Sequence, residues 1–386
     1  MGSRILHCNS IDNLECCSFI LEALFDVIQL IDPSSLKLPI CPLPRPGDRV
    51  CWFAEAHQVS GVMTGHDIEG NAVILNDFGN GTTKSFEEIR LCDPFNRVGP
   101  NWMTLPNGGK IIRPDSATSQ RFAQLLARRI PPGPTYRNLI EEIWSRGFEA
   151  YVVGGTVRDT LNGGTANDID VVTTMPLVQA KKFLPSMFRY DPSLSKERGY
   201  ISIGGSKRSG DPHIDLKLFS DSLPGTKDAI FGVGFERDVR HRDFSCNAVY
   251  YEPINDVIID PTGRGISDAQ QKLLSFICGS ANHHQYAQIF IRTIKFVARG
   301  YQLTPETKTC LTTDLVGALP SMRLQIRSHY IKAQVLGNCS SPAQYPTVMQ
   351  TYRECMEELG LAYVWDTYFE PLVGGLLNEQ SSIVET

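Results

Sequence analysis

The chain has 386 residues, of which 42% are hydrophobic and 20% charged, and its formal net charge at pH 7 is −5. The length predicts two or three domains, and the composition excludes a disordered or a fibrous protein. The negative net charge argues against a protein that binds nucleic acid over its whole surface, but it is compatible with a local basic face.

Residues 1–45 are expected to form N-terminal helices, because apolar residues recur at helical spacing from Phe19 to Ile31 and prolines follow from Pro33 onward. This apolar stretch is too short for a membrane span, so we expect no membrane partner. No secretory leader is recognisable, and the 11 cysteines include no Cys-x-x-Cys pair. Both features favour a cytoplasmic protein with reduced thiols.

Residues 46–98 contain several short runs of β-forming residues separated by Gly or Asp turns. This pattern predicts a small β-barrel of the SH3 or Tudor kind. Such a barrel either binds a peptide or a nucleic acid or only braces a neighbouring domain, and both alternatives stay open. Residues 99–115 are rich in Pro, Gly and Asn and are expected to form a linker.

A more informative region begins at residue 116. Helices are predicted over 116–129 and from Thr135 to Gly147, followed by a buried strand at 150–153. The strand runs into Gly154-Gly155-Thr156-Val157-Arg158-Asp159. A glycine turn before a helix start presents backbone N–H groups that suit a phosphate, and Arg158 would add a positive charge there. Glycines alone are weak evidence, because tight turns need them for conformational reasons.

Three aspartates predict a site for a divalent cation. Asp168 and Asp170 are two residues apart on an expected strand, so both side chains project from one face. Asp215 stands in a second alternating run, 213–219, and is expected to join them. Carboxylate oxygens favour Mg²⁺, with Mn²⁺ as the alternative ion. The competing interpretation is that these aspartates are solvated residues of a strand.

These motifs resemble the class II tRNA nucleotidyltransferase (CCA-adding enzyme) and bacterial poly(A) polymerase family of the polymerase β superfamily. The similarity covers roughly residues 120–336. The family signature Gly-Gly-x-Val-Arg-Asp, followed by Asp-x-Asp, stands at 154–159 and 168–170. A second family motif, Arg-Arg-Asp-Phe-Thr-x-Asn-Ala, is similar to residues 241–248, where His241 replaces the first Arg.

The resemblance implies an α+β fold. A nucleotidyltransferase head with a mixed sheet would occupy 116–252, an all-α neck 253–336 and a helical tail 337–386. It implies that Asp168 and Asp170 are catalytic and bind the metal ions, and Asp215, placed by its strand pattern, is expected to complete this catalytic metal site. The residues implied to bind the nucleotide, including two on a basic face of the neck, are Gly154, Gly155, Arg158, Arg242, Asp243, Asn247, Arg292 and Lys295.

The activity implied by the resemblance is metal-dependent transfer of a nucleoside monophosphate from an NTP to an RNA 3′ end, of tRNA or of the poly(A) type. In the family, a Glu-Asp-x-x-Arg motif reads the incoming base, and it falls here on residues 285–289, where neither the Asp nor the Arg remains. Altered base selection is therefore expected. Two alternatives stay open: transfer to a protein or small-molecule acceptor, and a non-catalytic RNA-binding scaffold.

Overall fold

The computed structural model describes residues 30–39, 43–55, 57–94, 102, 105–130, 133–164, 166, 169–183, 199–204, 213–220, 230–277, 283–334, 336, 339 and 341–372. The helices expected before residue 30 and the predicted metal ligand Asp168 lie outside these ranges. None of the helices within them is both long enough and apolar enough to cross a membrane.

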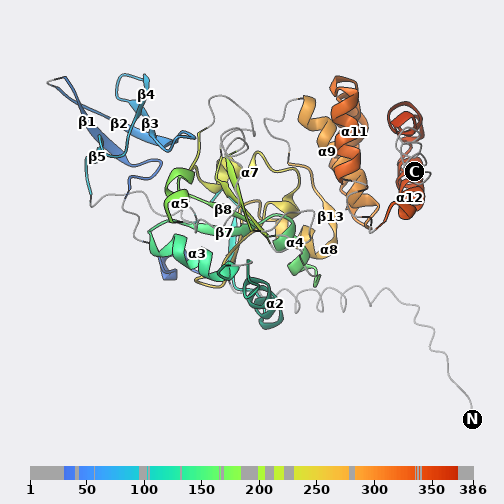
Figure 1. Cartoon of the computed structure of the whole chain (residues 1–386), viewed down its shortest axis with the longest axis horizontal. Helices are drawn as coiled ribbons and strands as arrows, with labels where there is room; N and C mark the ends of the chain where they lie inside the picture. The colour runs from blue at the N-terminus through green and yellow to red at the C-terminus, as the bar shows by residue number, and fades with distance from the viewer. Residues whose placement is uncertain are drawn as a thin grey trace, which may run out of the picture.

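A seven-stranded mixed sheet forms the centre of the molecule (Figure 1). Its strands, in spatial order, are β6 (Lys110–Ile112), β12 (Val257–Asp260), β11 (Tyr250–Glu252), β7 (Ala150–Val153), β8 (Ile169–Thr173), β10 (His213–Leu218) and β9 (Tyr200–Gly204). β8 and β10 pair in parallel, whereas β7 pairs with β8 in antiparallel fashion. The mixed sheet expected for the head is confirmed. The predicted linker contributes β6 to it.

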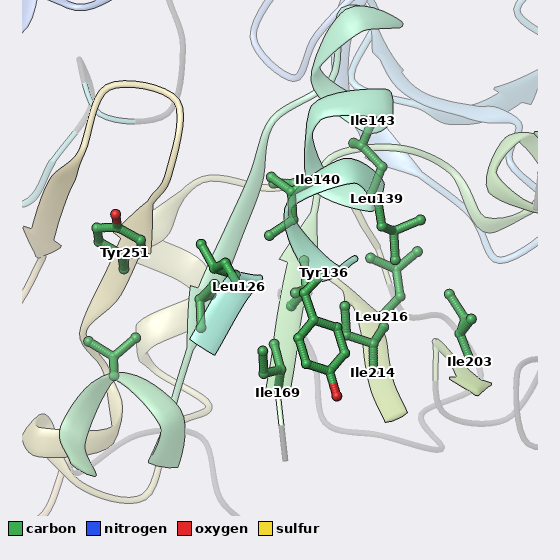
Figure 2. Close-up of a cluster of buried hydrophobic side chains, with 14 of the residues drawn as sticks. Leu126, Tyr136, Leu139, Ile140, Ile143, Ile169, Ile203, Ile214, Leu216 and Tyr251 are labelled. Carbon is green, nitrogen blue, oxygen red and sulfur yellow. The ribbon is translucent and has the colours of Figure 1, made fainter. Parts of the chain in front are cut away.

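The helices α2 (Ser116–Leu126) and α3 (Tyr136–Ser145) confirm the two helices expected before the glycine turn. Thr135 caps α3 by accepting a hydrogen bond from the backbone of Asn138, as its position in the sequence predicts. Figure 2 shows side chains of α3 beside residues of the central strands. The labelled residues of this buried cluster include Tyr136, Leu139, Ile140 and Ile143 of α3, with Ile169 of β8 and Ile214 and Leu216 of β10.

Further short elements of the head lie between or beside its strands. They are α4 (Gly155–Leu161), α5 (Leu177–Phe183), α7 (Phe235–Val239), the 3₁₀ turns η1 (Pro33–Ser35) and η3 (Ser245–Asn247), and α8 (Gly265–Gln271).

The N-terminal region folds as a five-stranded antiparallel sheet at one end of the molecule (Figure 1). Its order is β4 (Gly81–Lys84), β3 (Ala72–Asn76), β2 (His57–His66), β1 (Arg49–Ala54) and β5 (Arg90–Leu91). Trp52, Met63 and Ile74 lie in its small core. Within the residues that the structure describes, the outer strands β4 and β5 do not pair with each other, so closure into a barrel is not confirmed.

A helical region follows at the opposite end of the molecule (Figure 1). Its elements are α9 (His283–Val297), α10 (Pro305–Cys310), the π-helix η4 (Leu311–Leu315), η5 (Leu319–Ser321), α11 (Leu324–Gln334), η7 (Pro342–Gln344), α12 (Tyr345–Glu358), α13 (Ala362–Val364) and the π-helix η8 (Trp365–Phe369). Phe290 and Ile294 of α9 are fully buried among these helices.

The expectation that residues 253–336 are entirely helical is wrong. β12 joins the central sheet, and β13 (Leu273–Leu274) pairs in parallel with β14 (Gln302–Leu303). The β-branched run Val257-Ile258-Ile259 has strand propensity and is buried in the sheet, which explains why it does not continue as helix.

His66 ties the N-terminal sheet to the head. Its backbone N–H donates to the carbonyl of Phe231 at 2.9 Å, and the N–H of Phe231 returns a bond to His66 at 2.8 Å. The imidazole is 3% exposed, and its Nε2 has no hydrogen-bond partner. Burial lowers the pKa of His66 to about 4, although the carbonyl and the charge of Asp67 oppose the shift. The ring is therefore neutral in the folded protein at neutral pH.

Protonation of His66 is expected to destabilise the protein in acid. Between pH 6.5 and about 4 the unfolded chain binds a proton that the folded chain does not, so stability falls as the pH is lowered through this range. The loss should approach roughly 3 kcal/mol. Urea unfolding at pH 7 and pH 4.5 should show a smaller loss in His66→Gln than in the wild type. The exposed control His329→Gln should keep the wild-type loss, and an equal loss in all three proteins would contradict the assignment.

Candidate active site

The glycine turn predicted from the sequence joins β7 to α4. Gly154 has φ 74°, a conformation that glycine adopts without steric cost and that other residues rarely adopt. A Cβ atom built on Gly154 would lie 3.7 Å from Oδ2 of Asp170, so the turn and this carboxylate are neighbours. Gly155 starts α4 beside the guanidinium of Arg158, whose Nη2 would lie 3.4 Å from a Cβ at this position. Two parts of the predicted site therefore lie close together.

Asp170 and Asp215 occupy directly paired positions of the parallel strands β8 and β10. Paired residues of adjacent strands project from the same face of a sheet, so the two carboxylates share one face. Asp215 is 8% exposed and accepts a hydrogen bond from Ser202 Oγ at 2.8 Å. Lys217 places its Nζ 2.8 Å from Asp170 Oδ1. We refer to Asp170, Asp215, Ser202 and Lys217 as the carboxylate site.

The chemistry of the carboxylate site fits a divalent cation. Carboxylate oxygens are hard donors of the kind that Mg²⁺ prefers. The ion pair with Lys217 shows that the local field already attracts a positive charge to Asp170. Among the described residues, no three His, Cys, Asp or Glu side chains gather into a metal-binding group. Whether the third aspartate, Asp168, completes such a group stays a prediction.

Arg242 interacts electrostatically with Asp170 of the carboxylate site. Its Nε and Nη2 donate to Asp238 Oδ2 at 3.1 and 2.8 Å, and its guanidinium carbon lies 5.5 Å from the centre of the Tyr250 ring. Burial alone would lower the pKa of Arg242, but the charges of Asp238 and Asp170 help to hold it above its ordinary value. Arg242 is therefore a permanent cation within electrostatic reach of Asp170.

Four of the predicted nucleotide-binding residues, joined by Asp159, form a chain of polar contacts from α4 to the helical region. Arg158 donates from Nε to Asp159 at 2.8 Å and from Nη1 to Asn247 Oδ1 at 2.6 Å. Asn247 then donates to Asp243 Oδ1 at 2.8 Å, and Arg292 of α9 donates to Asp243 Oδ2 at 2.7 Å. We call these five residues the bridging network.

The centre of the bridging network is buried, whereas its ends, Asp159 and Arg292, are 36% and 38% exposed. The Arg158 side chain is 7% exposed, and its guanidinium carbon lies 4.7 Å from the centre of the Phe296 ring of α9. Burial would raise the pKa of Asp243, but the charge of Arg292 and the hydrogen bond from Asn247 lower it below its ordinary value. In this structure these predicted nucleotide-binding residues contact one another, and their contacts with a nucleotide stay predictions.

The predicted basic face of α9 lies next to this network. Lys295 donates from Nζ to Gln334 of α11 at 3.1 Å. Burial and the positive charges of Arg299, Arg292 and Arg158 lower the pKa of Lys295 to about 8. Burial is the largest cause of this shift, and the three arginines add to it. A group of cations of this kind suits an anion of high charge.

Sequence reasoning missed two members of the carboxylate site. Lys217 stands two residues after Asp215 on the same alternating strand, so the period of that strand could have placed both side chains on one face. Ser202 contacts Asp215 only because β9 pairs with β10 in the observed register. No local sequence pattern predicts that pairing.

Comparison with known proteins supports the family resemblance drawn from the motifs. Residues 150–275 match the family model described as the poly A polymerase head domain. The multifunctional CCA protein of Xylella fastidiosa is 29% identical over 178 residues, which cover 42% of this chain and 39% of that protein. Poly(A) polymerase I of Haemophilus influenzae is 28% identical over 171 residues, 42% of this chain and 37% of that protein.

A solved structure of a CCA-adding enzyme in complex with CTP overlaps 68% of this chain and 58% of its own, with 19% sequence identity and a TM-score of 0.47. The chain spans about two fifths of the length of the curated relatives that it matches.

Proposed function

We propose that this chain, a relative of the CCA-adding enzymes and poly(A) polymerases through its head, transfers a nucleoside monophosphate from an NTP to the 3′ end of an RNA. One observation carries the proposal. Asp170 and Asp215 stand side by side on parallel strands, and the Gly154 turn adjoins Asp170, all within the residues that match the poly A polymerase head domain.

The roles of the residues follow from their charges. Asp170 and Asp215, together with Asp168, would hold Mg²⁺ or Mn²⁺. Divalent ions bound there would lower the pKa of the RNA 3′-hydroxyl and offset the charge of the departing pyrophosphate. The absence of a Cβ at Gly154 leaves space for a phosphate beside Asp170. Arg242 and Lys295 would supply positive charge for the triphosphate.

Base selection is proposed to differ from that of the CCA-adding enzymes. Tyr286 packs edge-on against Phe276, with ring centroids 6.0 Å apart, and Ile289 offers only apolar contact. Neither residue supplies the paired donors and acceptors that distinguish one base edge from another. We therefore expect addition of a single nucleotide type or loosely selective addition, rather than ordered synthesis of C-C-A.

We also propose that the N-terminal sheet closes into a barrel and that it binds a ligand. Between Asp48 and Asp93 the chain carries eight acidic residues and three basic ones. This charge disfavours contact with the phosphates of a nucleic acid. Of the two ligand classes considered for a barrel, a peptide is therefore the better fit.

Incubation with each α-labelled NTP, Mg²⁺ and a mixture of total RNA and total protein tests the proposed function. Label should appear in RNA, at its 3′ end, and the four NTPs should show whether one base is preferred. Label in protein would favour the alternative acceptor. Absence of transfer with either Mg²⁺ or Mn²⁺ would favour a non-catalytic scaffold. Ordered completion of truncated tRNA would contradict the proposed base selection.

Lys295 should make nucleotide binding depend on pH. Because its pKa is about 8, its positive charge is lost as the pH rises through 8, so affinity for the triphosphate should fall between pH 7 and pH 9. The expected loss is roughly three- to tenfold. Titrations with an NTP analogue that cannot be cleaved should show that the affinity of Lys295→Arg depends less on pH than that of the wild type. The same dependence of affinity on pH in both proteins would exclude Lys295 as the titrating group that causes it.

A further inference from the structure

Lys217 lies in the middle of the carboxylate site and has no role in the mechanism above. It follows Asp215 by two residues on β10, so both side chains project from the same face of the sheet. Its Nζ contacts Asp170 Oδ1 at 2.8 Å. The side chain of Lys217 is 37% exposed and that of Asp170 is 35% exposed. The ion pair is therefore reachable from solvent and is not locked in the core.

The ion pair has a direct electrostatic explanation. Asp170 and Asp215 are paired across β8 and β10, and two neighbouring carboxylates repel each other when both are charged. The ammonium group of Lys217 compensates this charge at Asp170. A divalent cation at Asp170 would draw on the same carboxylate charge, so the ammonium group and the metal ion compete for it.

We propose that Lys217 is a built-in competitor for the divalent cation at Asp170. The inference rests on the proposed function, because it takes the carboxylate site to be the metal site. The ammonium group repels a metal ion at this carboxylate, so metal binding favours movement of Nζ away from Asp170, and the partial exposure of Lys217 provides room for that movement. Lys217 acts through Asp170, so it is a positioning residue. Its effect is to weaken the binding of a free cation, so that more metal is needed to load the site.

Titration of the full chain with Mn²⁺, with free Mn²⁺ followed by electron paramagnetic resonance and no nucleotide present, tests the inference. Lys217→Met should lower the Kd for Mn²⁺ about fivefold, because the competing charge is gone. Lys217→Arg keeps the charge and should stay near the wild-type Kd. Lys84→Met removes a comparable ion pair, with Glu88 at 3.4 Å on the N-terminal sheet, and should leave the Kd unchanged.

The outcomes separate this inference from the proposed function. Equal Kd values for the wild type and Lys217→Met, with binding abolished in Asp170→Asn, would overturn the competitor role and leave the metal site in place. Weaker binding in Lys217→Met would also overturn it. No Mn²⁺ binding by the wild type or by Lys217→Met would overturn the inference and the metal site together. Circular dichroism spectra matching the wild type establish that each variant is folded.

Discussion

Replacement of Asp170 by Asn is expected to reduce the rate of nucleotide transfer by about 10³-fold or more. The amide keeps the shape of the carboxylate but lacks the charge that holds a divalent cation beside the Gly154 turn. The effect should appear in kcat with any NTP that the wild type accepts. The rate of labelled NTP incorporation into RNA, at saturating Mg²⁺, measures it.

The matched control for this variant is Asp77→Asn. Asp77 also forms a salt bridge, with Arg49 at 2.6 Å, but it lies in the turn after β3 of the N-terminal region. This control should transfer nucleotides at a rate close to that of the wild type. A rate for Asp170→Asn within tenfold of the wild type, in a protein with an unchanged melting temperature, would exclude Asp170 from the catalytic machinery.

Replacement of Arg158 by Met should cause the largest loss of stability in the bridging network. The substitution leaves the buried Oδ1 of Asn247 without its donor and removes the cation from the face of the Phe296 ring. Loss of a buried, hydrogen-bonded charge of this kind costs about 2–4 kcal/mol. Urea-induced unfolding of the full chain, followed by circular dichroism, measures the free energy of unfolding.

Two further variants test whether the loss of stability comes from the bridging network or from the loss of any arginine. Arg146→Met removes an exposed pair with Glu142 on α3 and should cost less than about 0.5 kcal/mol. Arg158→Lys keeps the charge but cannot reproduce the forked donors that reach both Asp159 and Asn247, so it should recover only part of the loss. Equal stability of Arg158→Met and Arg146→Met would contradict the role of the network.

Local patterns were sufficient for the elements that carry the site. The alternation of residues 213–219 predicts a strand with Asp215 on its polar face, and the structure contains β10 there. The predicted turn at Gly154 is present with a positive φ, α2 begins at Ser116 as expected, and α3 begins at the expected cap Thr135. Each of these features depends on residues that lie within a few positions of it in the sequence. Periodicity and capping rules can therefore predict them.

Local patterns failed where the outcome depended on distant pairing. Residues 46–98 contain the expected strands, but sequence runs do not specify whether the outer two meet, and closure of the barrel is not confirmed. The family resemblance implies a helical neck over 253–336, whereas β12 pairs with β11 in the central sheet, a tertiary contact that no local pattern specifies. Strand propensity alone does not tell which sheet a short run joins.

By itself, the sequence determined the kinds of element, the glycine turn and the three aspartates that suggest metal-dependent chemistry. Only the tertiary structure decided that Asp170 faces Asp215, that Lys217 reaches Asp170 across 47 residues of sequence, and that Arg158 contacts Asn247 across 89. The physical reason is the range of the interactions. Helix and strand periods arise from neighbouring residues, whereas strand order and side-chain contacts arise from burial of the whole core, which no short segment encodes.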